Sequence, residues 1–227
     1  MAIKSFELSG GIVVEDIEQN FSNSLKRALK DDRYELMERR AIAAAVRPSD
    51  RIVELGAGCG VIGTCLARAS APSQVTSVEA NPDLLPIIAH THACNGVTGI
   101  TVINALVGAA DGKATFYISS DFWASSLSPD TPDIARSVEI DTLDVNELLR
   151  NTGANVLVCD IEGAEYTLFP DIDWRQIDLV VAELHPDTTD LARQSRLFHV
   201  LMTAGLYPDL AAMERPRVMV FKRNSRV

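Results

Sequence analysis

Apolar residues recur every four positions in the first part of the chain, which predicts helices with one buried face. Between residues 16 and 46 these positions are Ile17, Phe21, Leu25 and Leu29. The polar pair Asp31-Asp32 is expected to divide the segment into two helices, and Pro48 to stop the second. We therefore expect residues 1–48 to form an N-terminal helical lead-in that packs on the core.

After residue 48, short apolar runs alternate with helical patterns. The expected strands are Arg51–Leu55, Val75–Ala80, Ile100–Val107, Asn155–Cys159, Leu179–Leu184 and Val218–Phe221, with Leu206–Met213 as a weaker candidate. The expected helices are Val61–Ala69, Asp83–Cys94, Ala164–Phe169 and Thr189–Ala204. Strands that alternate with helices at this spacing favour right-handed βαβ units and a mainly parallel sheet. We expect residues 49–227 to form one α/β domain.

The middle of the chain interrupts this alternation. Ala114–Ser119 alternates in the manner of a strand after the turn dipeptide Asp111-Gly112. Residues 120–135 are rich in Ser, Asp and Pro, which predicts a long loop.

The composition of the 227 residues is that of an ordinary globular protein, with 47% hydrophobic and 23% charged residues. The 21 Lys and Arg against 31 Asp and Glu give a net charge of −10. Because nucleic-acid binding depends mostly on basic residues that neutralise phosphates, nucleic acid is not expected as a partner. No apolar run approaches the ~18 residues of a membrane span, and the N-terminal residues do not resemble a signal peptide. We expect a cytoplasmic protein without a membrane partner.

The cysteines and three of the histidines show no metal-binding pattern. The cysteines are Cys59, Cys65, Cys94 and Cys159, with no C-x-x-C pair and no histidine at zinc-finger spacing. We expect them to be buried free thiols in a reducing compartment. His90 and His92 are two residues apart on one expected helix and point in different directions, so they and His199 are expected to be structural or exposed.

The most informative segment is Glu54-Leu55-Gly56-Ala57-Gly58-Cys59-Gly60, which follows a strand and opens a helix. Glycines at such a turn let the backbone approach a ligand that a Cβ would keep away, and the helix N-terminus beyond offers free N–H groups. A dinucleotide loop, G-x-G-x-x-G, would need glycine at position 61, where the chain has Val61. Glu79, at the end of the second strand, is placed to accept hydrogen bonds from both ribose hydroxyls of a nucleotide-type ligand.

Further motifs run in order along the chain as far as residue 186. With the glycine loop, they are E-L-G-A-G-C-G (54–60), V-E-A-N-P (78–82), I-N-A-L-V-G (103–108), D-G-K-A-T-F-Y (111–117), S-S-L (125–127), E-I-D-T-L-D (139–144), C-D-I-E-G-A-E (159–165) and A-E-L-H-P (182–186). Together they resemble a class I methyltransferase of the FkbM type, although the family usually has Lys where this chain has Cys159. The resemblance implies a Rossmann-like fold, with a mainly parallel seven-stranded sheet flanked by helices. It also implies S-adenosylmethionine as the cofactor and S-adenosylhomocysteine as the product.

The resemblance also places the cofactor. The residues implied to contact it are Glu54, Gly56, Ala57, Gly58, Gly60, Glu79, Ala80, Asn81, Asn104, Ala105 and Asp160. In this arrangement the glycine loop surrounds the amino-acid end, Glu54 reaches the ammonium group and Glu79 holds the ribose. The adenine is expected to lie against Ala80, Asn81, Asn104 and Ala105. Asp160 ends the strand next to the first one, at the switch point where ligands of open α/β sheets bind.

Methyl transfer to a hydroxyl group also needs a group that removes the acceptor's proton. The candidates at the ends of two later strands are Asp160, Glu162, Glu165, Glu183 and His185. We expect His185 to be the general base, because the ordinary pKa of imidazole is about 6.5, with Asp160 and Glu183 as further catalytic residues. One alternative is that His185 only ends its strand before Pro186. Another is a divalent cation held by Asp160, Glu183 and His185, since carboxylate oxygens suit Mg²⁺, but we do not favour metal dependence.

Substrate contacts are expected from the irregular middle loop and from the lead-in helices. The candidates in the loop are Phe122, Trp123, Ser125 and Ser126, and Glu162 is a further one. Two large aromatic residues in a polar loop suggest a wall over the cofactor or the substrate, although anchoring of the loop to the core explains them equally well. Tyr34 and Glu35 are expected to close over the site from the other side.

These observations favour a methyltransferase that acts on a hydroxyl group of a small molecule, such as a sugar or a secondary metabolite. An N-methyltransferase or a peptide-directed enzyme is the alternative within the same class. A non-catalytic binding protein is a third hypothesis, but the loop glycines and Glu79 that binding of the cofactor requires are all retained. A nucleotide-dependent oxidoreductase is disfavoured by Val61. The pattern leaves the acceptor and the oligomeric state open.

Overall fold

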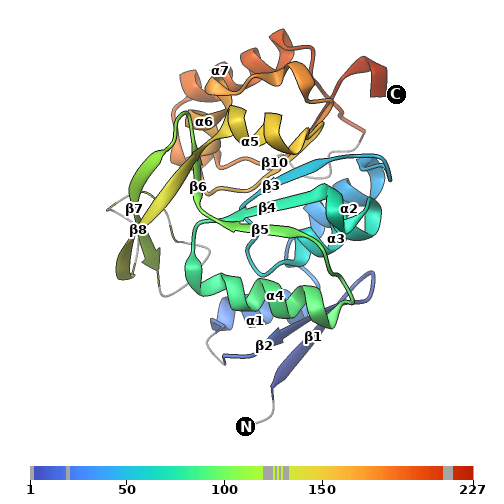
Figure 1. The fold of residues 1–227 in the computed structure, drawn as a ribbon, viewed down its shortest axis with the longest axis vertical. Coiled ribbons are helices and arrows are strands. Elements are labelled where there is room, and N and C mark those ends of the chain that lie inside the picture. The colour runs from blue at the N-terminus through green and yellow to red at the C-terminus, as the bar shows by residue number, and fades with distance from the viewer. Residues whose placement is uncertain are drawn as a thin grey trace.

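The computed structural model describes residues 3–18, 21–119, 125, 127, 129, 133–211 and 217–226. Its centre is a seven-stranded sheet with the order β11-β12-β10-β9-β3-β4-β5 (Figure 1). The strands are β3 (Ile52–Leu55), β4 (Val75–Glu79), β5 (Thr101–Asn104), β9 (Val156–Cys159), β10 (Leu179–Glu183), β11 (Tyr207–Pro208) and β12 (Val218–Lys222). β12 runs antiparallel to both of its neighbours, and the other neighbouring pairs are parallel. The predicted mainly parallel seven-stranded sheet is therefore confirmed.

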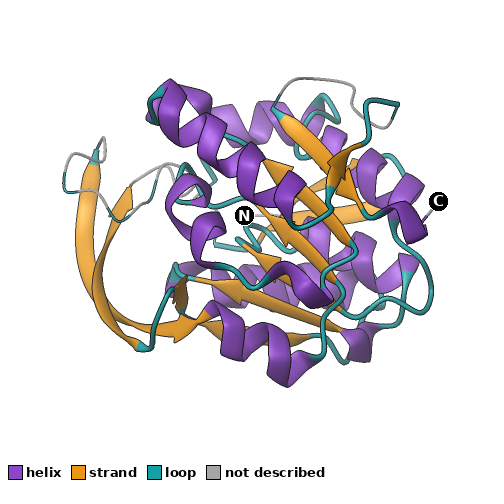
Figure 2. Ribbon diagram, turned by 90° about the horizontal axis from the view of Figure 1, so that it is seen from above, coloured by secondary structure: helices purple, strands orange, loops and turns teal. Residues whose placement is uncertain are grey.

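Helices cover both faces of this sheet (Figure 2). They are α1 (Asn23–Lys30), α2 (Leu36–Ala45), α3 (Val61–Ala69), α4 (Leu85–Cys94), α5 (Val145–Thr152), α6 (Glu165–Leu168) and α7 (Leu191–Thr203). Short 3₁₀ helices span Pro72–Gln74, Pro82–Leu84, Phe169–Asp171, Trp174–Gln176, Pro186–Thr188 and Asn224–Arg226. On one face α5, α6 and α7 bury Leu149, Leu168 and Leu201, and on the other α2 and α3 bury Ile42 and Leu66. Because both faces are covered, every residue of β3 and β9 is buried.

The first part of the predicted helical lead-in is a β-hairpin instead. β1 (Lys4–Leu8) and β2 (Ile12–Asp16) pair antiparallel, and helical structure begins only with α1. The buried residues of the hairpin alternate with more exposed ones, which is the period of a strand; they are Phe6, Leu8, Ile12, Val14 and Asp16. Gly10 and Gly11 have φ angles of 82° and 66°, as a tight hairpin turn requires. The prediction of a helical lead-in over residues 1–48 is wrong here because it followed only the period of four that begins after the hairpin.

The predicted packing of the lead-in on the core, and its division into two helices, agree with the structure. α1 ends at Lys30 and α2 begins at Leu36, with Asp32 in a left-handed turn between them. The hairpin and α1 share one apolar cluster with the glycine loop and α4; its buried residues include Leu8, Val14, Leu25, Ala57, Cys59 and Ile88. The N-terminal segment therefore supports the glycine loop directly.

A small three-stranded sheet in the order β6-β8-β7 curves away from the main body (Figures 1 and 2). Its strands are β6 (Leu106–Gly108), β7 (Gly112–Ser119) and β8 (Ile134–Asp144). The predicted single strand Ile100–Val107 is wrong, because Ala105 separates β5 in the large sheet from β6 in the small one. The sequence analysis also missed β8 and α5. Most of β8 is exposed and only its Ile140 is buried, so no apolar run marks it.

None of the helices in the described part of the chain combines the length and the apolar character that a membrane crossing requires.

Candidate functional site

A cavity of about 1130 Å³ opens at the carboxyl ends of the central strands. β4 lies on one side of β3, and β9 and β10 lie on the other, so the cavity is at the point where the strand order reverses. The predicted site residues that line it are Gly56, Gly58, Glu79, Ala80, Asn81, Ala105, Ser125, Asp160, Glu162, Glu183 and His185. The predicted residues that do not line it are Glu54, Ala57, Gly60 and Asn104. The structure thus brings most of the predicted cofactor and catalytic residues to one cavity.

The glycine loop is shaped by close contacts with two other parts of the chain. Gly56 has a φ angle of 84°, and a Cβ on it would lie 1.8 Å from the carbonyl oxygen of Asp160. A Cβ on Gly58 would lie 2.8 Å from Oη of Tyr34 and 3.2 Å from Oε1 of Glu35. Larger residues at these positions would push apart β3, β9 and the segment before α2. Tyr34 and Glu35 also line the cavity, as predicted.

Glu79 ends β4 and connects the glycine loop to the wall of the cavity. Its carboxylate is buried and accepts hydrogen bonds from the backbone N–H groups of Gly58 (3.0 Å) and Asn81 (2.7 Å). Burial raises the pKa of this carboxyl group, and these N–H groups partly oppose the rise. Each carboxylate oxygen can accept more than one hydrogen bond, and the ribose role of Glu79 stays a prediction.

Glu54 and Asn104 support the cavity from behind. Glu54 is 1% exposed, and its Oε2 accepts a hydrogen bond from the hydroxyl group of Ser77. Burial raises the pKa of Glu54 to about 7. Nδ2 of Asn104 donates to the carbonyl oxygens of Glu79 (2.8 Å) and Ala80 (3.1 Å). Both side chains hold the strand ends in place, and their direct contact with a cofactor stays a prediction.

His185 follows β10 and is held in position by Glu165. The backbone N–H of His185 donates to Oε1 of Glu165 at 2.7 Å, and its Nδ1 lies 3.2 Å from the same oxygen. Glu165 is fully buried, and its other oxygen accepts from the backbone N–H of Gly163 at 2.8 Å. Nε2 of His185 is thereby directed towards Oδ1 of Asp160 (3.9 Å) and Oε2 of Glu162 (3.4 Å).

Neighbouring carboxyl groups determine the protonation of His185. Burial lowers the pKa of the imidazole, but the hydrogen bond to Glu165 and the charges of Glu162 and Asp160 raise it to about 9. This is well above the ordinary value of about 6.5 on which the sequence-based expectation of a general base rests. Burial, together with the charge of Glu183, raises the pKa of Asp160 well above its usual range. These neighbours therefore favour the protonated form of His185 in the free protein.

Two carboxyl groups of the lead-in, those of Glu35 and Glu38, also line the cavity. Burial raises the pKa of Glu38 in α2 to about 7, with a further contribution from the charge of Glu183. Burial also raises the pKa of Glu35 well above its usual range. Among the described residues, Oε2 of Glu35 and Oδ1 of Asp160 are buried without a hydrogen-bond partner. Buried oxygens of this kind need a donor or a cation, so the cavity suits a positively charged ligand group.

Glu38 is a site residue that the sequence analysis missed. It lies on a helix whose packing against β10 brings it to Glu183, far away in the sequence. The signal available in the sequence was a charged residue on the inward face of an amphipathic helix. In the structure the side chain of Glu38 is 6% exposed. Lys, Glu, Arg and Asp are almost never fully buried without a reason in the surrounding structure.

The predicted substrate residues are placed only in part. Ser125 is buried and lines the cavity, where its Oγ accepts a hydrogen bond from the backbone N–H of Ser119 at 3.0 Å. Glu162 also lines the cavity, in a left-handed backbone conformation with a φ angle of 52°. The candidates that lie outside the described residues are Phe122, Trp123 and Ser126. Contact with the substrate stays a prediction for all of them.

Asp160, Glu162 and His185 form a group whose potential metal-binding atoms all lie within 4.8 Å of one another. Glu183, a member of the cation site considered from the sequence, is not part of this group. A cation bound there would have to displace the proton that the carboxyl groups hold on His185.

The cysteines and the other histidines lie in different surroundings. All four cysteines are free; Cys59 and Cys159 are buried as expected, Cys65 is half-buried and Cys94 is exposed. The prediction of four buried thiols is therefore wrong for Cys94, which lies at the end of α4. His92 is buried behind the glycine loop and His199 is exposed, in agreement with the expectation that neither belongs to the site.

Comparisons with known proteins agree with the fold. A family model described as the methyltransferase FkbM domain matches residues 54–204, well over half of the chain. The matched segment begins at Glu54, before the glycine loop, and includes Glu79, Asp160 and His185. A sequence comparison with curated proteins gives no match.

Three solved structures illustrate the likeness of the fold. A putative transferase from Pyrococcus horikoshii has a TM-score of 0.53 at 12% identity, over 97% of this chain and 72% of that one. TYW2 from M. jannaschii, solved in complex with AdoMet, has a TM-score of 0.50 at 14% identity, over 97% of this chain and 86% of that one. Trm5b from Pyrococcus abyssi has a TM-score of 0.54 at 10% identity, over 98% of this chain and 56% of that one. At these identities the likeness shows the fold.

Proposed function

Because the chain belongs to the FkbM methyltransferase domain family, we propose that it transfers a methyl group to a hydroxyl group of a small molecule, such as a sugar or a secondary metabolite. The protein is an S-adenosylmethionine-dependent methyltransferase. Our proposal concerns the acceptor and the roles of single residues. The observation that carries the proposal is the position of His185, whose Nε2 faces the cavity beside Asp160 at the ends of two adjacent strands.

The residues around the cavity fit S-adenosylmethionine. When bound, this cofactor supplies a methyl group that is activated by a positively charged sulfonium. In our proposal Glu79 holds the ribose, and the oxygens of Glu35 and Asp160 that are buried without a hydrogen-bond partner face the positive charges. The glycine loop leaves room for the amino-acid end, because Gly56 and Gly58 have no side chains. The residues we assign to the adenine are Ala80, Asn81 and Ala105, all of which line the cavity.

His185 acts in this proposal as the general base, in its neutral form. Glu165 accepts a hydrogen bond from the N–H at Nδ1, which leaves Nε2 to take the proton of the acceptor hydroxyl. The acceptor oxygen bonds to the methyl carbon while the electrons of the broken S–C bond stay on sulfur, which leaves S-adenosylhomocysteine. Asp160 and Glu183 stabilise the imidazolium that forms.

The magnitudes are sufficient for such a reaction. Holding donor and acceptor in line supplies about 7–11 kcal/mol of the barrier. A positioned base adds about 10²–10⁴-fold. The protein therefore needs alignment and one proton acceptor, and this proposal uses no metal.

The acidity of the protein supports a small molecule over a nucleic acid as the acceptor. The net charge is −10, and the wall of the cavity carries Glu38, Glu162 and Glu183. These charges repel a phosphate backbone.

We also propose that residues 1–48 cover the site, since Glu35 and Glu38 reach the cavity from this segment, and that residues 49–227 form the methyltransferase domain.

The acceptor can be identified by incubating the protein with methyl-labelled S-adenosylmethionine and separate small-molecule, RNA and protein fractions of its source cells. We expect label in the small-molecule fraction, and mass spectrometry and NMR should place it on oxygen. His185→Gln is the control for enzymatic transfer and should transfer little label. Label in RNA, in protein or on nitrogen contradicts the proposed acceptor.

EDTA tests the role of the strand-end carboxylates. Turnover should be unchanged after treatment with EDTA if His185 takes the proton. Full loss of turnover that Mg²⁺ restores would assign Asp160, Glu162 and His185 to a cation instead.

A further inference from the structure

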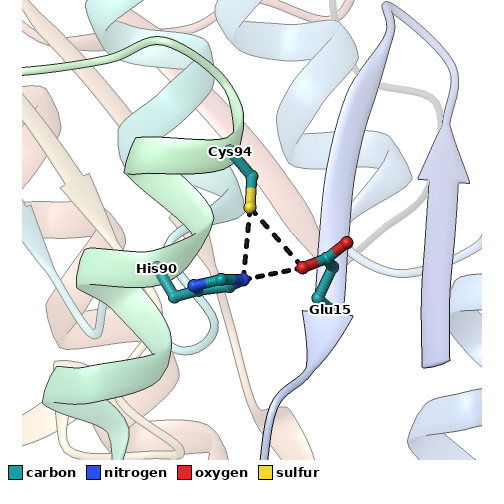
Figure 3. A group of neighbouring side chains, drawn as sticks. All are labelled: Glu15, His90 and Cys94. Atoms are coloured by element: carbon teal, nitrogen blue, oxygen red, sulfur yellow. Dashed lines mark hydrogen bonds and ion pairs between the residues drawn. The ribbon is translucent and has the colours of Figure 1, made fainter. Parts of the chain in front are cut away.

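Three side chains with metal-ligating atoms meet between the N-terminal hairpin and α4, away from the cavity. Figure 3 shows Glu15 of β2 facing His90 and Cys94 of α4. Nε2 of His90 lies 2.8 Å from Oε2 of Glu15, and Sγ of Cys94 lies 3.2 Å from Nε2 of His90 and 3.7 Å from Oε2 of Glu15. None of the three lines the cavity, so this cluster is separate from the methyltransferase site.

The spacing of the three donor atoms is close to that of a tetrahedral metal centre. All three atoms lie within 4.8 Å of one another. Zinc holds nitrogen, oxygen and sulfur ligands at bond lengths that put neighbouring ligand atoms roughly 3.3–3.6 Å apart. The two distances from Sγ of Cys94, 3.2 and 3.7 Å, bracket this range. Only the pair of Glu15 and His90 has to open, and both side chains are partly exposed, at 25% and 32%, so the movement disturbs no packed core.

The backbone holds the donors in place before any ion binds. His90 and Cys94 are four residues apart on α4, so they project from the same face of the helix, one turn apart. The hairpin is tied to the same helix end by Asn95, whose Nδ2 donates to the carbonyl oxygen of Val13 (2.7 Å) and whose Oδ1 accepts from the N–H of Val13 (2.9 Å). Glu15, two residues further along β2, is thereby held opposite the two donors of α4.

The donor set indicates which metal would bind. A thiolate, an imidazole and a carboxylate are ligands of zinc, whereas Mg²⁺ and Ca²⁺ take oxygen ligands. Cys94 is exposed, so the fourth position is open to water. We infer that Glu15, His90 and Cys94 form a zinc site that fastens the N-terminal hairpin to α4. Because the hairpin packs against the glycine loop, the ion would stabilise the floor of the cavity without touching it.

Cobalt is the probe that separates this site from the strand-end carboxylates. The full chain, reduced and free of chelators, is titrated with Co²⁺ and followed by absorption. We expect a near-ultraviolet sulfur-to-cobalt band that saturates at one equivalent and that Zn²⁺ removes by displacement. The group of Asp160, Glu162 and His185 contains no sulfur, so it cannot produce this band.

Matched substitutions test each ligand. Cys94→Ala should abolish the band. His90→Ala should weaken Co²⁺ binding by at least about tenfold, because the loss of a residue that only hydrogen-bonds to a metal ligand already lowers metal affinity by about this factor. The controls Cys65→Ala, on α3, and His199→Ala, on α7, should keep both band and affinity. Zinc should also raise the melting temperature of the wild type and leave that of Cys94→Ala unchanged. A wild type without the band, or a band that survives Cys94→Ala, overturns the inference and leaves an ion pair of Glu15 and His90. No readout depends on methyl transfer, so this result is independent of the proposed function.

Discussion

Carboxyl groups surround the cavity. Their hydrogen-bond partners divide four of them into a pair that is held by the backbone and a pair that is not. Glu79 and Glu165 each accept backbone N–H groups on both oxygens. Glu35 and Asp160 each keep an oxygen that is buried without a hydrogen-bond partner. The first pair is therefore fixed in position, Glu165 against His185 and Glu79 in the place that we propose for the ribose, whereas the second pair remains available to a ligand.

Glu79→Gln should weaken the binding of S-adenosylmethionine, because an amide offers one acceptor oxygen in place of two and carries no charge. Hydrogen bonds to charged groups contribute about 1.5–3 kcal/mol, so isothermal titration should show a dissociation constant roughly ten to a hundred times higher. Glu7→Gln, at an exposed position of β1, is the matched control. An unchanged dissociation constant for Glu79→Gln would remove this residue from the ribose role.

The pH dependence of catalysis should follow His185. Because only the neutral imidazole accepts a proton, kcat/KM should rise with pH up to about 9, the pKa of His185 in the free enzyme. His185→Gln should lose this rise and lower kcat by about 10²–10⁴-fold, and His199→Gln should change neither. A profile that is already flat above pH 6 would show that His185 is not the base.

At the scale of elements, burial on both faces decided what could be predicted. β3, β4 and β9 were predicted to within one residue at each end, because strands covered by helices on both sides are rich in apolar residues, and in β9 the run is unbroken. α3 was predicted with both of its ends, since the glycine loop marks its start. β8 and the N-terminal hairpin have one face open to solvent over much of their length. The partners of β8 lie at a distance in the sequence and no local pattern reveals them. The hairpin does carry a local signal, the alternation around Gly10-Gly11, which a search for helical periods passed over.

The residues of the site also divide into those that the sequence pattern marks and those that only the folded chain brings together. Glu79, Asp160 and His185 were predicted because the carboxyl ends of parallel strands meet at one edge of a sheet. Glu38 was missed. Glu54 does not line the cavity, and its contact with the cofactor stays a prediction. The raised pKa of His185 was also out of reach, because it depends on carboxyl groups gathered from several elements.

Two glycines with nearly the same φ angle allow the effect of backbone strain to be compared with that of close packing. Gly10 and Gly56 have φ angles of 82° and 84°, but a Cβ on Gly10 meets no atom within 4 Å, whereas one on Gly56 lies 1.8 Å from the carbonyl oxygen of Asp160. Gly10→Ala should lower the free energy of unfolding by about 1–2 kcal/mol, the cost of a left-handed residue with a side chain. Gly56→Ala should lower it further and also weaken cofactor binding, since the ends of β3 and β9 must separate.

Urea unfolding and isothermal titration measure the two effects of these substitutions. Equal losses of stability in Gly10→Ala and Gly56→Ala, with unchanged cofactor affinity, would contradict the close approach of the two strand ends.

At the scale of the whole molecule, distant segments are joined by a buried polar cluster around Asp50. The side chain of Arg226 pairs with both oxygens of Asp50 and donates to the carbonyl oxygen of Ala45 (3.1 Å). Asp50 also accepts from the backbone N–H of Arg47 (2.7 Å) and from Nδ2 of Asn155 (3.1 Å). The cluster thus connects the end of α2, the start of β3, the segment before β9 and the segment after β12.

Arg226→Met should lower the free energy of unfolding by about 3–5 kcal/mol, because it leaves the buried carboxylate of Asp50 without its cation. Although burial alone would raise it, the hydrogen bonds from Arg226 and Arg47 hold the pKa of Asp50 below its usual value. The contribution of this group is therefore complete above the unfolded pKa of about 3.9 and is lost as the pH falls through the folded value. The difference between wild type and variant should shrink in acid.

Chemical denaturation at neutral and acid pH measures this difference. Arg175→Met, which breaks an exposed pair with Asp173, is the control and should leave stability unchanged. Equal effects of Arg226→Met and Arg175→Met would contradict the role of the buried cluster.

The buried carboxyl groups of the cavity make ligand entry a proton-releasing event. Burial raises the pKa of Glu35 well above the usual range, and that of Glu38 to about 7, so these groups hold protons near neutrality. A positively charged ligand favours their ionised forms, and its affinity should therefore increase with pH. Calorimetry in two buffers of different ionisation enthalpy measures the released protons, and a heat that does not depend on the buffer would contradict this account. The thioether product lacks the sulfonium charge, so discrimination between donor and product should sharpen as the solution becomes more alkaline.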